Sequence, residues 1–247
     1  MASFSPTASV ESPRVRRDDH GVVPPARGGD DGRSGRPGSP EYRTRLRRAR
    51  LGLLVALTPV LMLFVSFTSA YVVRQGLPTL DPHTNQMVRD WIPIQLPNLL
   101  LANTCVLLLS TVSMELARRQ MKREAALSSA GTLPDGLFNG EKALSWLGLT
   151  VLLGSCFLAG QWLAWRELAT RGFYVSTNPS SSFIYLLTGT HAIHLLGGVL
   201  ALMVAAGAAL WRRPAGTPGI LVDVTAWYWH FMALLWIYIL CLLEFAH

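Results

Sequence analysis

Hydrophobic residues in this sequence are gathered into five long runs that contain no charged side chain. The runs cover residues 51–73, 91–114, 143–165, 172–211 and 224–243. A helix needs about 20 apolar residues to cross the hydrocarbon core of a bilayer, and backbone groups in lipid must form their hydrogen bonds within their own segment. The pattern therefore predicts an all-α integral membrane protein, a bundle of five transmembrane helices at about residues 51–74, 95–117, 143–166, 182–211 and 224–245.

The fourth run is too long for one span, because it extends over 40 residues. Its first part, TNPSSS at 177–182, is polar and contains Pro179, so we expect the helix itself to begin near residue 182. The overall composition agrees with a membrane protein. Hydrophobic residues make up 50% of the chain and charged residues only 15%, which is too apolar for a soluble domain of this size.

The first 45 residues have a different composition, rich in Pro, Gly, Ser and Arg and without hydrophobic periodicity. Such a segment cannot bury enough surface to offset the entropy of ordering. We therefore predict a disordered basic cytoplasmic tail at 1–45 and one membrane domain at 46–247. No apolar stretch of signal-peptide type occurs in this tail.

The arginines of RTRLRRAR, at 43–50, lie directly before the first apolar run. A basic cluster at this place favours anionic phospholipid headgroups as a partner. Nucleic-acid binding is not predicted, because Phe4 and Tyr42 are the only aromatic residues of the tail that could stack on bases.

The distribution of Lys and Arg predicts the orientation. With the N-terminus in the cytoplasm, the segments flanking the spans carry twelve basic residues on the cytoplasmic side and four on the other. The positive-inside rule then predicts N-in and C-out.

Polar residues inside a span are costly and are usually functional or bridge helices. No Asp, Glu, Lys or Arg lies in the middle of a predicted span, which argues against an ion pathway formed by this chain alone. His191 and His194 share one face of the fourth predicted helix, and His230 lies on the fifth.

These three histidines have two interpretations, as ligands of a haem or metal ion or as packing residues between helices. A b-type haem needs two histidines at matching depth, but helix rise places His191 about 13 Å from the outer boundary and His230 about 9 Å from the inner one. In a core of about 30 Å these depths differ by roughly 8 Å, a gap that His194 closes in part. Zinc or copper needs a further ligand, for which His230 is the only candidate.

The simple interpretation is that His191 and His194 form hydrogen bonds between helices. Gly197, Ala201 and Ala205 follow at four-residue spacing, and we expect this small-residue ridge to admit a neighbouring helix closely.

Cysteine spacing does not predict a disulfide or a zinc site. Cys105, Cys156 and Cys241 fall on three different predicted helices, and no Cys-x-x-Cys motif occurs. We expect three buried, unreactive thiols.

Two motifs resemble subunit III of the haem–copper cytochrome c oxidases. THAIHLLGGVLAL, at 190–202, has that family's His-x-x-His followed by x-x-Gly, and AWYWHFMALLWIYIL, at 226–240, resembles its last-helix motif. The resemblance extends to the preceding helices of the family and covers about residues 45–247. The segments that carry it are FTSAYVVRQG, LPNLLLANTCVLLLSTVSMELARR, GQWLAW and SSSFIYLLTGTH. Five spans are similar to the short bacterial form of the family.

The resemblance implies a non-catalytic subunit of a respiratory terminal oxidase that reduces O2 with electrons from cytochrome c and pumps protons. It implies that haem and copper are bound by partner chains and that this chain binds no cofactor. Expected partners are subunit I, against which the chain packs, subunit II in the same hetero-oligomer, and phospholipid held in a cleft. The expected location is a bacterial plasma (inner) membrane.

Other functions remain open at this point. The equivalent subunit of a quinol oxidase or nitric oxide reductase would fit the same motifs. A free-standing b-type membrane cytochrome or a small transporter would belong to a different class.

Ten residues are candidates for the lipid cleft, a subunit interface or the structure around them. They are His191, His194, Gly197, Gln161, Trp229, His230, Phe231, Trp236, Tyr71 and Asn103. Three membrane carboxylates of the family are absent here, where the aligned residues are Val60, Ala164 and Ala233. A local role in proton delivery is therefore not predicted from the resemblance.

Overall fold

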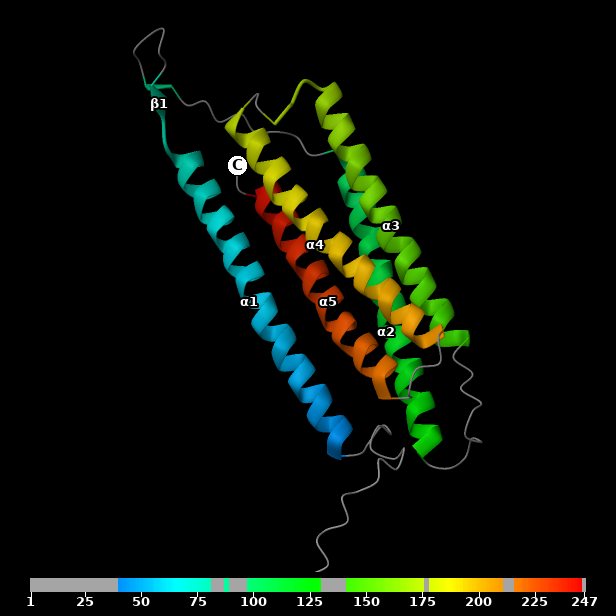
Figure 1. The fold of residues 1–247 in the computed structure, drawn as a ribbon. Coiled ribbons are helices and arrows are strands. Elements are labelled where there is room, and N and C mark those ends of the chain that lie inside the picture. Colours follow the sequence, from blue (N-terminus) through cyan, green and yellow to red (C-terminus); the bar gives the residue numbers. More distant parts are fainter. Residues whose placement is uncertain are drawn as a thin grey trace, which may run out of the picture. The chain divides into compact units, whose positions relative to one another are not determined.

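The computed structural model describes residues 40–80, 87–88, 97–129, 141–175, 178–210 and 216–245. These residues form the helices α1 (Pro40–Gly76), α2 (Asn98–Ser129), α3 (Glu141–Thr170), α4 (Pro179–Leu210) and α5 (Gly216–Phe245), shown in Figure 1. Two short antiparallel strands, β1 (Thr79–Leu80) and β2 (Met87–Val88), follow α1. By length and composition, all five helices can cross a membrane. The predicted class and the five spans are thus confirmed within the described residues.

Several helices are longer than predicted. α1 begins at Pro40 rather than near 51, so residues 40–45 are helical and do not belong to a disordered tail. Pro at the first helical position and an acidic residue, Glu41, in the first turn both favour a helix start here. Residues 1–39 lie outside the described residues, and the tail prediction is untested for them.

α2 likewise continues to Ser129, and α5 begins at Gly216 rather than near 224. The predicted bounds followed the apolar runs, whereas a helix is free to continue beyond the lipid boundary. α4 begins at Pro179, three residues before the predicted start.

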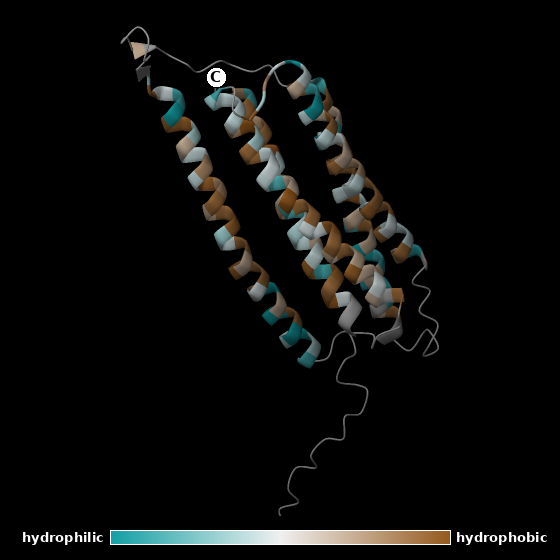
Figure 2. Cartoon of the chain, turned by 45° about the horizontal axis from the view of Figure 1, so that its top comes forward, coloured by the Kyte–Doolittle hydropathy of each residue, from teal (hydrophilic) through white to brown (hydrophobic). Residues whose placement is uncertain are grey.

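The helices α2 to α5 pack as a bundle, in which α2 lies along α3, α3 along α4, and α5 along both α4 and α2. Its interior holds large side chains that are fully buried, among them Trp229, Trp236, Phe157 and Leu147. Figure 2 shows that α1 is hydrophilic at its ends and hydrophobic along its middle, as expected for a helix that crosses a bilayer.

α1 packs against α4 and α5 through a narrow stripe of side chains. Its buried residues are Leu57, Phe64 and Tyr71, each seven positions after the last, and Arg50 lies seven positions earlier. A seven-residue repeat keeps side chains on one face of a helix. We call Arg50, Leu57, Phe64 and Tyr71 the α1 stripe.

The three cysteines do not lie where they were predicted. Cys105, Cys156 and Cys241 are all exposed on the helices, so the expectation of buried thiols was wrong. A lipid-facing position is as apolar as a buried one, and an apolar run therefore does not tell which face of a membrane helix is covered.

Candidate functional site

The two indole rings of the α5 motif form hydrogen bonds to α2. Trp229 and Trp236 lie seven residues apart and are both buried. Trp229 donates its Nε1 hydrogen to Ser110 Oγ over 3.0 Å, and Trp236 donates to Thr104 Oγ1 over 2.9 Å. Each buried indole thus has an acceptor, as buried tryptophans usually do.

Glycines on two other helices make room for these aromatic side chains. A Cβ atom added at Gly154 of α3 would lie 2.7 Å from Trp229 Cη2, and one added at Gly198 of α4 would lie 2.9 Å from Tyr228 Cε1. The close approach on α4 therefore uses Gly198 rather than the predicted Gly197.

Gly197 has no atom within 4 Å of an added Cβ, and Gly197 and Ala201 are exposed. The predicted ridge is therefore uncovered at these two positions, whereas its third residue, Ala205, is fully buried in the core. Successive residues point about 100° apart around a helix of 3.6 residues per turn, which is why Gly197 and Gly198 face different neighbours.

His191 is completely buried by aromatic rings. Its ring centroid lies 5.0 Å from that of Trp236 and 6.1 Å from that of Phe157. Neither ring nitrogen has a hydrogen-bond partner among the described residues. The expected hydrogen bond between helices is thus absent for His191, which bridges α3, α4 and α5 by ring packing.

His194 is half-buried, and its Nδ1 lies 2.8 Å from the carbonyl oxygen of Thr190 in the same helix. Its ring approaches Phe64 of the α1 stripe with centroids 6.1 Å apart. The hydrogen bond that crosses to another helix here uses the backbone, because Tyr228 Oη donates to the carbonyl oxygen of His194 over 2.8 Å.

The structure does not bring the three histidines together. His230 Nε2 lies 3.6 Å from Glu115 Oε2, whereas His191 contacts Trp236. Trp236 follows His230 by six residues, which corresponds to about 9 Å along α5. This separation agrees with the predicted mismatch in depth. Within the described residues, no group of three or more His, Cys, Asp or Glu side chains could hold a metal ion.

The other candidates are buried or half-buried in the bundle. Asn103 Nδ2 donates to the carbonyl oxygen of Phe157 over 3.0 Å, which joins α2 to α3. Gln161 is buried, and its Oε1 has no partner among the described residues. Tyr71 packs edge-on against Phe183 of α4 with ring centroids 5.7 Å apart, and the half-buried Phe231 packs against the core.

A cluster of charged residues, which the sequence reasoning missed, joins three helices at one end of the bundle. Asp223 of α5 has only 4% of its side chain exposed and accepts from Arg50 at 2.7 Å and from Arg118 at 3.0 Å. Lys122 Nζ is 3.3 Å from the same carboxylate. Arg50 comes from α1 and the other two cations from α2, so one carboxylate connects α1, α2 and α5. We call these four residues the Asp223 cluster.

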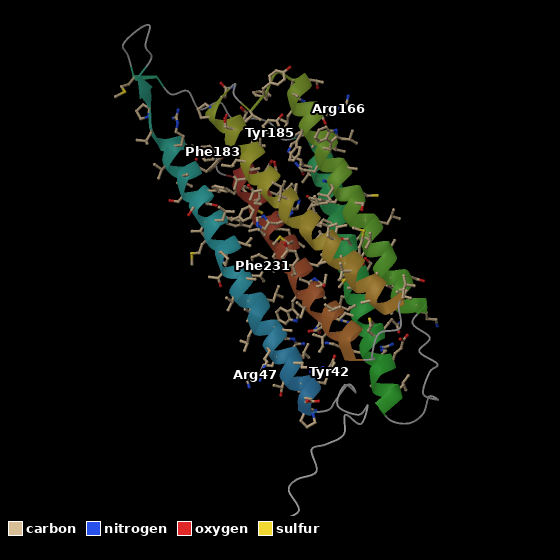
Figure 3. All side chains as sticks on the ribbon, viewed as in Figure 1. Tyr42, Arg47, Arg166, Phe183, Tyr185 and Phe231 are labelled. Carbon is tan, nitrogen blue, oxygen red and sulfur yellow. The ribbon has the colours of Figure 1, made fainter. Side chains whose placement is uncertain are left out.

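Glu115 extends the cluster, because it accepts from Arg118 at 3.0 Å and from Arg119 at 2.9 Å. The sequence signal for the cluster was Asp223 directly before the last apolar run, together with Arg50 directly before the first run and Arg118 four residues after the second. Figure 3 labels Tyr42 and Arg47 at this end of the helices and Arg166 and Tyr185 at the opposite end.

The fold and these contacts define a five-span membrane bundle closed by aromatic packing and a cluster of charges. The sequence pattern of the family "Cytochrome c oxidase subunit III" matches residues 43–245, from the first turn of α1 to the last residue of α5. The chain belongs to the cytochrome c oxidase subunit III family, as the two histidine-containing motifs predicted.

Relatives from several bacteria carry the same description. The chain is 30% identical over 119 residues to a probable cytochrome c oxidase subunit 3 of Nocardia farcinica, covering 45% of this chain and 57% of that protein. For cytochrome c oxidase subunit 3 of Corynebacterium diphtheriae the identity is 31% over 116 residues, with the same coverage. For that of Bacillus sp. (strain PS3) it is 27% over 211 residues, covering 82% of this chain and 89% of the relative. The chain thus spans little more than half of the first two relatives and most of the third.

Proposed function

We propose that the chain is subunit III of a respiratory cytochrome c oxidase in a bacterial plasma membrane. The observation that carries the proposal is the family match over residues 43–245, which reaches through all five helices. The relative from Bacillus sp. (strain PS3), aligned over 82% of this chain, supports the same role. The complex would pass electrons from cytochrome c to O2 and pump protons, with this chain as one of its membrane subunits.

In this proposal the chain is non-catalytic, and haem and copper are held by partner subunits. The surroundings of His191 support this, because its ring is enclosed by Trp236 and Phe157 of the same chain. A haem iron could reach its nitrogens only after these rings had moved apart. His230 is directed to Glu115 instead.

The chain would act by packing against subunit I, in a hetero-oligomer that also contains subunit II. A rigid bundle suits this role, and the indole hydrogen bonds to Ser110 and Thr104 fix α5 against α2 inside it. Four of the ten candidate residues retain exposed surface, and we propose these for contact with lipid or a partner: His194, Gly197, His230 and Phe231. The six buried ones shape the bundle from within.

Phospholipid would bind at the end of the bundle that carries the Asp223 cluster. Arg43, Arg45, Arg47 and Arg48 are exposed on the first turns of α1. Trp227 is 49% exposed, and the guanidinium of Arg50 lies 6.0 Å from its ring centroid. Exposed arginines beside an interfacial tryptophan favour anionic headgroups. By the positive-inside rule this end faces the cytoplasm, which leaves the C-terminus on the other side.

Affinity purification of the tagged chain from mild-detergent membranes tests the proposal. We expect a large multi-span partner to co-purify, together with a haem a absorbance band. Haem b with a quinol-oxidizing activity would instead assign the chain to a quinol oxidase. Haem in proportion to this chain without any partner would contradict the proposal and support a free-standing cytochrome.

A further inference from the structure

Two buried polar side chains, Gln161 and His191, carry atoms that have no hydrogen-bond partner among the described residues. Gln161 of α3 is 2% exposed and His191 of α4 is 0% exposed. Gln161 Oε1 and both ring nitrogens of His191 have no hydrogen-bond partner among the described residues. Buried polar atoms without any partner are rare in folded proteins, and in lipid no bulk water reaches them.

The two side chains lie within about one helical turn of each other along the bundle. Phe157, Gln161 and Trp165 are spaced by four residues and therefore share one face of α3. Phe157 meets the ring of His191, and Trp165 donates its Nε1 hydrogen to Thr188 Oγ1 over 3.1 Å. Gln161 therefore lies between two contacts to α4, one at His191 itself and one a turn before it.

The neighbouring donors are already committed to other acceptors. Trp236 Nε1 donates to Thr104 Oγ1, Asn103 Nδ2 to the carbonyl oxygen of Phe157, and Trp165 Nε1 to Thr188 Oγ1. Thr188 in turn donates to the carbonyl oxygen of Ile184. The two indoles and the Thr188 hydroxyl each carry one donor hydrogen, so none of them can donate to Gln161 or His191 without giving up its own bond. Asn103 Nδ2 keeps a second hydrogen, but neither Gln161 Oε1 nor a ring nitrogen of His191 accepts it.

The three unpartnered atoms define which hydrogen-bonding groups a ligand between them must carry. Gln161 Oε1 requires a donor, while a neutral imidazole requires a donor at one nitrogen and an acceptor at the other. A single molecule that donates twice and accepts would therefore satisfy Oε1 and one nitrogen together. It must also be small and neutral, because aromatic rings enclose His191 and the side chains in contact with it are uncharged.

We propose that a buried water molecule is bound between Gln161 Oε1 and a ring nitrogen of His191. Water has two donors and two acceptors, and buried waters in proteins typically make about three hydrogen bonds to such groups. The water would link α3 to α4 where neither side chain reaches a protein partner. This site does not depend on the proposed function in the oxidase.

A cryo-electron microscopy map at about 2 Å, of the full chain in whatever assembly it purifies with, tests the site. We expect a separate density peak at hydrogen-bonding distance, about 2.7–3.2 Å, from both Gln161 Oε1 and one nitrogen of His191. A direct hydrogen bond between the two side chains, or no peak between them, would overturn the proposal.

Variants give a second readout. Gln161→Leu and His191→Phe should each remove the peak. Ser113→Ala should keep it, since Ser113 forms a different buried hydrogen bond, to Thr150. A peak that persists in both of the first two variants would count against the site. The wild-type map decides the question even where a variant does not accumulate, and a water found in a chain without oxidase partners would support the site while contradicting the proposed function.

Discussion

Trp236 and Thr104 connect the last helix to the second across the interior of the bundle. The indole N–H of Trp236 donates to Thr104 Oγ1 over 2.9 Å, while Thr104 donates to the carbonyl oxygen of Leu100 in its own helix over 2.7 Å. The same indole packs on His191 of α4. Phe157 of α3 packs edge-on against it as well, so four helices meet at one tryptophan of the family motif.

Thr104→Val should weaken the bundle, because it keeps the shape of the side chain and leaves the indole N–H of Trp236 without an acceptor. The expected cost is about 0.6–2 kcal/mol, the range for hydrogen bonds between helices in membranes. Unfolding by SDS titration, followed by circular dichroism, measures it. Thr111→Val is the matched control, because Thr111 donates only to the carbonyl oxygen of Leu108 in its own helix. Equal losses in both variants would show that the bond to Trp236 contributes nothing specific.

Gly198→Ala should destabilize the chain, whereas Gly197→Ala should not. A Cβ at Gly198 would lie 2.9 Å from Tyr228 Cε1, and one at Gly197 meets nothing within 4 Å. Overpacking of this kind costs about 1–3 kcal/mol, while alanine improves helix propensity at an open position by up to about 1 kcal/mol. Thermal unfolding of the two purified variants in one detergent compares neighbouring positions directly. A larger loss for Gly197→Ala would contradict the assigned faces of α4.

Asp223→Asn should loosen the end of the bundle that holds the Asp223 cluster, because Arg50, Arg118 and Lys122 lose their shared carboxylate. We expect a cost of about 2 kcal/mol, below the ~3–5 kcal/mol of a fully buried pair, because the cations still reach solvent. The measurement is again SDS titration. Glu244→Gln on the same helix is the control, since Glu244 is exposed. If both variants unfold alike, the cluster does not stabilize the bundle.

Phe64→Ala should weaken the attachment of α1, since Phe64 is the member of the α1 stripe that meets His194. The cost should be about 2 kcal/mol, less than in a soluble core, because lipid competes for the apolar surface. Val65→Ala is the control, as Val65 is 53% exposed. The readout is the protease sensitivity of α1 in detergent. Unchanged sensitivity in Phe64→Ala would show that the stripe is not what holds α1.

Reporter fusions test the orientation inferred from the basic residues. Alkaline phosphatase fused after His247 should be active, because the predicted C-terminus lies outside the cytoplasm. Green fluorescent protein inserted between residues 130 and 140 should fluoresce. Fluorescence from a C-terminal fusion together with an inactive phosphatase would reverse the assignment.

The number and class of the helices could be predicted from the sequence, because an uncharged run of about 20 residues has one stable conformation in lipid. Their ends could not, because helix signals such as Pro40 and Glu41 lie in polar sequence outside the runs. The sequence also did not show which face of each helix contacts the rest of the bundle. Lipid and the protein interior select equally apolar residues, so the exposed cysteines and the exposed Gly197 could not be recognized.

The motifs identified the family, but they did not predict the contacts of individual residues. Hydrogen bonds from the rings of His191 and His194 to other helices were expected. The described bonds between helices come from other side chains, among them Trp229, Trp236, Asn103 and Tyr228. A histidine and a tryptophan are both amphipathic, and only the packing decides which of them meets an acceptor. Asp223 was missed because a charge at the end of a run is ordinary in sequence, and its three cations come from distant segments.

The most direct test of the account is the position of haem iron in a density map of the purified assembly. The account predicts that every haem lies in a partner chain packed against these five helices, and that Trp236 and Phe157 still enclose His191. Iron coordinated by His191, His194 or His230 of this chain would contradict it.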